Sequence, residues 1–377
     1  MRTETGKVEH LYLHVPFCAA KCNYCAFYSE AGSAAKMDDY VEAVLGELGC
    51  SVAALGKYGH SLTPTTIFFG GGTPSLLPAS LMRRVLEGLR RYLPLEGVSE
   101  WTIECNPSTV SIEKAKLFRE FGVNRISMGV QSLDDELLKT IGRVHSVKAA
   151  VESYEKLRVA GFDNINLDLI FGLPGQTLEH WRTTLRRTIE LQPEHISTYC
   201  LILEEDTHFW SLLQNGFIKP DEELDLEMYE LAIETLTTAG YQQYEVSNFA
   251  RNGRECAHNI AYWEGEEYIG LGPSACSTVG NRRWQNVPDI DRYIEGVTRQ
   301  QPAISFEETL TDELRAAERA AFGMRMNAGV PADLVKGRWN QQIAELLSSE
   351  LVQWRNNRLQ PTKRGILFAD EIATQFV

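Results

Sequence analysis

Hydrophobic residues along the first two thirds of the chain fall alternately into short runs and helically spaced stretches. Residues 8–15 form an apolar run, residues 37–55 have apolar positions at helical spacing, and a second run follows at 66–69. The alternation continues with predicted helices over 81–92, 113–121, 147–160 and 178–191 and predicted strands over 101–103, 125–128, 164–170 and 195–199. Six short strands alternating with helices predict parallel βαβ units. Because a closed barrel of this type needs eight strands, the fold class predicted is α/β, with an open, partial (β/α)6 barrel.

The pattern changes after a predicted helix over residues 222–239. Residues 241–304 are rich in aromatic residues and glycine, with no clear period. From 305 onward the pattern predicts helices over 311–326 and 340–351, a hairpin around 354–361 and a last helix. We therefore expect three parts: a partial-barrel domain at 1–240, an aromatic-rich extension at 241–304 and a small helical or winged C-terminal domain at 305–377.

Composition and charge narrow the class of protein. The 377 residues are 44% hydrophobic and 23% charged, which is ordinary for a globular chain. The net charge is −14 and no dense Lys/Arg run occurs, which argues against nucleic acid as a partner. No apolar stretch has the length of a membrane span, and residues 1–7 do not resemble a secretory signal.

The cysteines indicate a reducing compartment. Five of the eight are scattered singly, which argues against a disulfide framework and favours the cytoplasm. Four of them, Cys50, Cys105, Cys200 and Cys276, lie in apolar or small-residue contexts and are predicted to be buried.

The remaining three cysteines, Cys18, Cys22 and Cys25, are clustered. They have the spacing C-x3-C-x2-C directly after the first predicted strand. Three such thiolates can hold three irons of a four-iron cluster and leave the fourth iron open to an outside ligand. The alternative is a structural zinc site, which needs a fourth Cys or His at matching spacing. The nearest candidates, His14 and Cys50, do not supply one.

Further polar and glycine motifs follow the predicted strands. Residues 70–74 read GGGTP after the second strand, Glu104 ends the third, Gln131 ends the fourth and Asp168 ends the fifth. Alone, a glycine run is typical of a tight turn, and each polar residue is typical of a loop. In βα folds, however, sites collect at the carboxyl ends of the strands, so we expect these side chains to share one ligand.

Taken together these segments resemble one family over nearly the whole chain. They read LYLHVPFC at 11–18, GGGTP at 70–74, ECNP at 104–107, GVQS at 129–132 and DLIFGLPGQ at 168–176. The family is that of the radical S-adenosylmethionine (SAM) proteins that comprise oxygen-independent coproporphyrinogen oxidases and HemW-type haem chaperones. The resemblance implies a [4Fe-4S] cluster on the three cysteines and SAM bound beside it. The cofactor contacts that we expect on this basis are Tyr12, Tyr24, Gly71, Gly72, Thr73, Glu104, Gln131, Arg143 and Asp168.

Three features favour the HemW branch over the oxidases. The oxidases have a further cysteine two residues after the third, where this chain has Phe27, and a longer arm before the first cysteine than the 17 residues found here. Residues 258–263 also resemble the H-N-x-x-Y-W signature of HemW proteins. His258 offers an imidazole to haem iron, and Tyr262 and Trp263 offer flat faces to a macrocycle. A histidine among aromatic residues is also typical of a hydrogen-bonded core, and this alternative stays open.

The resemblance thus implies a haem chaperone that binds haem and a SAM-coordinated cluster and delivers haem to client proteins, with no catalytic residue assigned. A rival interpretation is an oxidase in which reductive SAM cleavage starts decarboxylation of a porphyrinogen propionate. A third is a radical SAM enzyme with another substrate. The implied partners are haem, haem-requiring clients that include membrane-associated ones, and an electron donor if SAM is cleaved. The chain itself is expected to have no membrane segment and to be a monomer or dimer.

Overall fold

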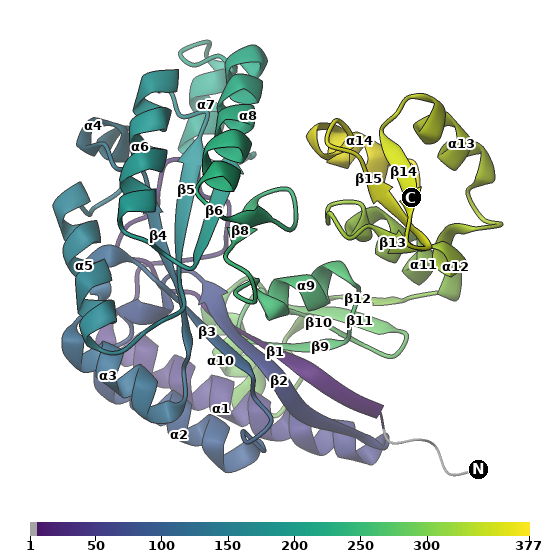
Figure 1. The fold of residues 1–377 in the computed structure, drawn as a ribbon. Coiled ribbons are helices and arrows are strands. Elements are labelled where there is room, and N and C mark those ends of the chain that lie inside the picture. The colour runs from purple at the N-terminus through teal and green to yellow at the C-terminus, as the bar shows by residue number, and fades with distance from the viewer. Residues whose placement is uncertain (1–5) are drawn as a thin grey trace.

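The computed structural model describes residues 6–377 (Figure 1). Residues 1–5, which are part of the stretch predicted not to be a secretory signal, lie outside this range. Six parallel strands lie side by side in chain order. They are β1 (Gly6–Val15), β2 (His60–Gly71), β3 (Glu100–Cys105), β4 (Arg125–Gln131), β5 (Ile165–Phe171) and β6 (His195–Cys200). The predicted α/β fold and its six parallel strands are confirmed.

Helices between the strands cover one face of this sheet (Figure 1). They are α1 (Ala34–Lys57), α2 (Ala79–Tyr92), α3 (Ile112–Phe121), α5 (Val147–Val159), α6 (Leu178–Glu190) and, after β6, α8 (Glu222–Thr238). Two short helices, α4 (Asp135–Thr140) and α7 (His208–Gln214), fall where the sequence pattern predicted none. Four of the long helices begin at a Ser or Thr whose hydroxyl accepts a hydrogen bond from a backbone N–H of the first turn.

The sheet is larger than the six strands predicted. β9 (Tyr268–Leu271) pairs in parallel with β1, and β10 (Cys276–Val279), β11 (Arg282–Asn286) and β12 (Ile304–Thr309) continue the sheet in antiparallel order. At the other edge, β8 (Asn248–Ala250) pairs with β6, and β7 (Gln242–Gln243) pairs with β8. The result is an open, mixed sheet of 12 strands. These strands are too short to give a periodic signal, and they cover the edges that the six parallel strands would otherwise leave unpaired.

The C-terminal part has a small sheet and a core of its own. β13 (Val330–Pro331), β15 (Arg358–Pro361) and β14 (Val352–Arg355) form an antiparallel sheet in that order. Around it lie α11 (Asp312–Gly323), α12 (Ala332–Val335), α13 (Asn340–Ser348) and α14 (Ala369–Ala373). Met324, Val335, Leu359 and Ile372 are among the buried residues of this second core. The helices and hairpin agree with the sequence pattern, whereas the division into three domains stays a prediction.

Two shorter helices connect the parts. α9 (Ala257–Trp263) lies between the main sheet and the C-terminal part, and α10 (Ile290–Thr298) packs against α1 (Figure 1). Within residues 6–377 we find no helix with both the length and the apolar character of a membrane span.

Of the four singly placed cysteines predicted to be buried, Cys105 is buried and Cys276 half-buried. The prediction was wrong for Cys50 and Cys200, which are exposed because each occupies an outward position on its helix or strand end.

One tryptophan joins three elements of the main core. Trp181 in α6 is fully buried, lies against Phe171 of β5 and donates a hydrogen bond from Nε1 to the carbonyl oxygen of Met228 in α8, at 2.8 Å. We expect Trp181→Ala to lower the free energy of unfolding by about 3–5 kcal/mol. The substitution leaves a large cavity and removes the hydrogen-bond partner of the Met228 carbonyl oxygen. The measurement is urea denaturation followed by circular dichroism. Tyr58→Ala, at an 81% exposed position, is the control and should change stability by less than about 0.5 kcal/mol.

Candidate functional site

The three clustered cysteines lie in the loop between β1 and α1. Backbone hydrogen bonds fix this loop: the Cys18 amide donates to the Glu30 carbonyl oxygen at 3.1 Å, and the Cys25 amide donates to that of Cys22 at 3.2 Å. All three thiols are free and half-buried. Burial raises the pKa of the Cys25 thiol, and the neighbouring Cys22 and Cys18 sulfurs raise it further. Three thiols gathered at one strand end suit a cluster whose iron charge offsets the cost of three thiolates.

The glycine segment after β2 lies directly against this loop. The Gly72 amide donates to the Val15 carbonyl oxygen at 2.8 Å, and the Thr73 amide donates to that of Phe17 at 2.7 Å. A Cβ atom at Gly72 would lie 2.7 Å from the Phe17 oxygen, so only glycine allows this approach. Thr73 Oγ1 lies 3.6 Å from Cys18 Sγ. The predicted neighbourhood of the cysteine and glycine motifs is therefore present in the structure.

Two predicted acidic residues, Glu104 at the end of β3 and Asp168 in β5, are half-buried at the carboxyl ends of their strands. A Cβ atom at Gly70 would lie 3.1 Å from Glu104 Oε2, so this carboxyl group faces the glycines. Burial raises the pKa of Glu104 to about 8, and the negative charge of Asp168 adds to the rise. Burial also raises the pKa of Asp168, against hydrogen bonds from Asn166 and Ser127. Two half-buried carboxyl groups whose charges interact favour a cationic ligand.

Gln131 and Arg143 lie beside the cysteine loop. Arg143 donates from Nη1 to Cys22 Sγ at 3.5 Å and from Nη2 to the Gly129 carbonyl oxygen at 2.6 Å. A Cβ atom at Gly129 would lie 2.8 Å from Gln131 Nε2 and 3.2 Å from Arg143 Nη2, so both side chains converge there. Gln131 has a positive φ of 67°, and its Oε1 is buried with no hydrogen-bond partner among the described residues. A buried amide oxygen without a protein partner suits a residue that accepts a hydrogen bond from a ligand.

The two tyrosines predicted as cofactor contacts line the same region. Tyr24 lies beside Arg143 and the sulfurs of Cys22 and Cys25, and burial raises its pKa. Tyr12 in β1 is half-buried. Its pKa is raised well above the usual value, mainly by burial and to a smaller extent by the nearby Glu104 carboxyl group. Its hydroxyl lies 3.2 Å from His14 Nδ1. Both positions agree with the predicted pocket.

These residues fit a four-iron cluster with SAM. The fit rests on three thiols in one loop, glycines that leave room for a ligand, the half-buried Glu104 carboxyl group that faces them and the buried Gln131 oxygen. In the described part of the chain, no three His, Cys, Asp or Glu side chains are placed to hold a metal ion as a group. The assignment of the three cysteines as cluster ligands thus stays a prediction from the sequence. Phe27, the residue found where oxidases have a further cysteine, is 71% exposed.

His258 lies away from the strand ends. Its Nδ1 is 2.8 Å from the Thr66 hydroxyl in the middle of β2, and its ring stacks on Phe68 at 5.2 Å between centroids. Burial, together with the nearby His10, lowers the pKa of His258 to about 3. The imidazole is therefore neutral. Tyr262 and Trp263 instead pack against Phe322 of α11. The structure does not gather the three signature side chains on one surface.

Sequence reasoning missed a group of buried polar residues on β3 to β6. Arg125 is 2% exposed, and Asn166, His195 and Ser197 are buried beside it on neighbouring strands. Polar residues two positions apart within apolar strands, as at Asn166 and Asp168, were the available signal.

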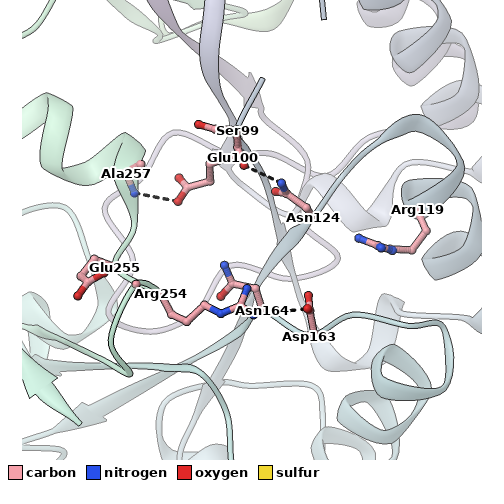
Figure 2. A pocket seen from close by; sticks show the side chains of 10 residues that line it. Ser99, Glu100, Arg119, Asn124, Asp163, Asn164, Arg254, Glu255 and Ala257 are labelled. Carbon is pink, nitrogen blue, oxygen red and sulfur yellow. Dashed lines mark hydrogen bonds and ion pairs between the residues drawn. The ribbon is translucent and has the colours of Figure 1, made fainter. Parts of the chain in front are cut away.

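A polar cavity of about 410 Å³ lies at the opposite, amino end of the same strands (Figure 2). Ser99, Asn124 and Asn164 directly precede β3, β4 and β5, and all three line it. The Glu100 carboxylate at its edge already accepts hydrogen bonds from the Ala257 and His258 amides of α9, at 2.8 and 3.0 Å. The cavity therefore lies at the far end of the sheet from the cysteine loop.

Comparison with known proteins agrees with this geometry. The model of the radical SAM superfamily matches residues 12–188. The chain is 37% identical to the heme chaperone HemW of Bacillus subtilis (strain 168), over 90% of this chain and 89% of that protein. It is 34% identical to the heme chaperone HemW of Lactococcus lactis, over 98% of each chain.

Among solved structures, coproporphyrinogen III oxidase (HemN) from Escherichia coli, a radical SAM enzyme, is similar with a TM-score of 0.84 at 26% identity, covering 99% of this chain and 90% of that one. Similarity to the HemW proteins at this identity and over this length exceeds what a shared fold alone requires. The chain therefore belongs to the HemW family within the radical SAM superfamily.

Proposed function

We propose that the chain is a haem chaperone that binds haem and a SAM-coordinated [4Fe-4S] cluster and delivers haem to client proteins. The observation that carries the proposal is the kinship with proteins named heme chaperone over nine tenths of the chain. We also propose that the six parallel strands form an open, partial barrel of the radical SAM type and that the C-terminal part is a separate winged domain. The proposal also includes a cytoplasmic location and client proteins that require haem. If SAM is cleaved, an electron donor is a further partner.

On this proposal, Cys18, Cys22 and Cys25 hold the cluster. When bound, cluster and SAM together supply one-electron chemistry or a regulatory state. Glu104 and Asp168 would offer carboxyl groups to the cationic groups of SAM, and Gln131 would offer its unpartnered oxygen. Arg143 holds the Cys22 sulfur in place and offsets thiolate charge.

The haem side of the proposal rests on α9. His258 is neutral, as a haem ligand must be, and Thr66 fixes its ring through Nδ1. A second cavity, of about 180 Å³, lies between α9, α11 and the β9–β10 strands, with Tyr262, Tyr268 and Phe322 among its walls. Flat aromatic walls suit the edge of a macrocycle, and Arg315 and Arg319 at the same cavity suit its propionates.

The alternative is a decarboxylating oxidase, favoured by the similarity to the solved HemN structure. Exposed Phe27 at the position of the oxidases' further cysteine counts against it. The two functions differ in a direct assay: the chaperone binds haem and makes no protoporphyrinogen from coproporphyrinogen.

Cluster binding should require each of the three cysteines. Cys18→Ala, Cys22→Ala or Cys25→Ala leaves one iron without its protein ligand, so we expect the four-iron absorption to be lost after anaerobic reconstitution. Iron and sulfide analysis of the purified protein is the measurement. Cys50→Ala, which removes an exposed thiol in α1, is the matched control and should keep full iron content. A loop variant with full iron and sulfide would remove that cysteine from the ligand set.

SAM binding should depend on pH through Glu104. The pKa of about 8 keeps this carboxyl group largely protonated near neutrality, and the ionised fraction rises as the pH rises toward 8. A cationic ligand prefers the ionised form, so SAM affinity should increase about tenfold from pH 6 to pH 7.5. Calorimetry on the reconstituted protein without reductant measures this dependence. Glu104→Gln should bind SAM more weakly at pH 7.5 with a flat profile, and an unchanged slope would remove Glu104 from the site.

Haem binding tests the proposal as a whole. Anaerobically reconstituted protein should bind added haem, seen as a Soret band, and should show no conversion of coproporphyrinogen when reduced and loaded with SAM. His258→Ala should lower haem affinity about tenfold or shift the Soret band, with iron and sulfide unchanged, because α9 lies outside the cysteine loop.

His10→Ala is the matched control, since His10 Nδ1 contacts the same Thr66 hydroxyl at 2.8 Å. This variant should keep the haem spectrum. Measurable decarboxylation by the unaltered chain would overturn the chaperone assignment, and equal effects in both histidine variants would take the ligand role from His258.

A further inference from the structure

The two sites of the proposed function are joined by a row of buried and half-buried side chains on the face of the sheet that carries Asp168. Ser127, Asn166 and His195 are paired across β4, β5 and β6, so their side chains share one face. Asn166 is 2% exposed and His195 fully buried. The row begins at Asp168, whose charge acts on Glu104, and ends at Cys256, the residue that precedes α9.

Each neighbouring pair in this row is hydrogen-bonded. Asn166 Nδ2 lies 2.8 Å from Asp168 Oδ1, and Asn166 Oδ1 lies 2.6 Å from His195 Nδ1. His195 Nε2 lies 2.8 Å from the Tyr244 hydroxyl, which lies 3.3 Å from the Cys256 amide nitrogen. The connection from the Asp168 carboxylate to the start of α9 is unbroken.

The hydrogen bonds all point in one direction. The Asn166 amide nitrogen donates to Asp168 and to the Ser127 hydroxyl, so its oxygen can only accept, and His195 must donate from Nδ1. A buried neutral histidine then accepts at Nε2, and the Tyr244 hydroxyl donates to it. The Tyr244 oxygen in turn accepts from the Cys256 N–H. Each donor is oriented toward Asp168, and in such a chain one bond polarises the next.

The end of the row fixes the helix that carries His258. The Glu100 carboxylate accepts from the Cys256 thiol at 3.4 Å and from the His258 amide at 3.0 Å (Figure 2 shows Glu100 beside Ala257). Arg125, 2% exposed, supplies the positive charge between Glu100 and Asp168. A change of charge at Asp168 therefore acts on groups that hold the first turn of α9.

We infer that His195 and Tyr244 are positioning residues that couple Asp168 to α9, so that SAM and haem each alter the other's affinity. This inference rests on the proposed function, because it takes Asp168 as a SAM contact and α9 as the haem side. Coupling of two binding sites is reciprocal, so the same factor must appear in either titration.

The test measures haem affinity of the reconstituted protein with and without saturating SAM, in the absence of reductant. In the unaltered chain the two dissociation constants should differ by a factor of about five or more. Tyr244→Phe removes only the hydroxyl that links His195 to Cys256, and the factor should fall to about one while haem and SAM still bind. Tyr241→Phe is the matched control: its hydroxyl, also buried, donates to the Pro193 carbonyl oxygen at 2.7 Å, outside the row, and the factor should be kept.

His195→Gln interrupts the same row at another link and replaces the tyrosine variant if that one does not fold. A factor of one in the unaltered chain, or an unchanged factor in both variants, would overturn the inference while leaving haem and SAM binding intact. Absence of haem or SAM binding in the unaltered chain is a different result: it would overturn the proposed function and, with it, the coupling.

Discussion

Two backbone hydrogen bonds join the end of β2 to the cysteine loop, from Gly72 to Val15 and from Thr73 to Phe17. They require the absence of a side chain at Gly72, because a Cβ atom would lie 2.7 Å from a carbonyl oxygen. This contact fixes the cysteine loop over the strand ends and brings Thr73 to Cys18. The Glu104 carboxyl group faces the same glycine segment from the end of β3. The candidate site is built around this contact between the cysteine loop and the glycine segment.

The two faces of the main sheet differ: one packs apolar side chains against the helices, and the other carries polar side chains. Helices pack on one face with residues such as Trp181 and Leu185, which are fully buried. The other face carries the buried polar side chains of Arg125, Asn166 and His195 and the half-buried Asp168. Burying so many polar groups costs free energy unless each is hydrogen-bonded, so the row from Asp168 to Cys256 is fully connected. A site of this kind is rigid before any ligand arrives.

The HNxxYW segment shows how a linear motif can be divided in space. His258 contacts β2, whereas Tyr262 and Trp263 contact α11 of the C-terminal part. His258 and Tyr262 are four residues apart, one turn along the same helix. α9 therefore spans from β2 of the main sheet to α11 of the C-terminal part.

The sequence by itself determined the parallel βα order, the strand ends at which the motifs lie and the cysteine spacing, because these depend on local periodicity and on residues close together in the chain. Glu104, Gln131 and Asp168 were predictable as a group, since carboxyl ends of parallel strands meet at one edge. The tertiary structure alone decided the remainder. The short strands β7 to β12 form only because the sheet has edges to pair with. The row through Asn166, His195 and Tyr244 depends on register between strands. His258 packs on Phe68 and Trp263 on Phe322, and these contacts depend on tertiary arrangement, which no local pattern encodes.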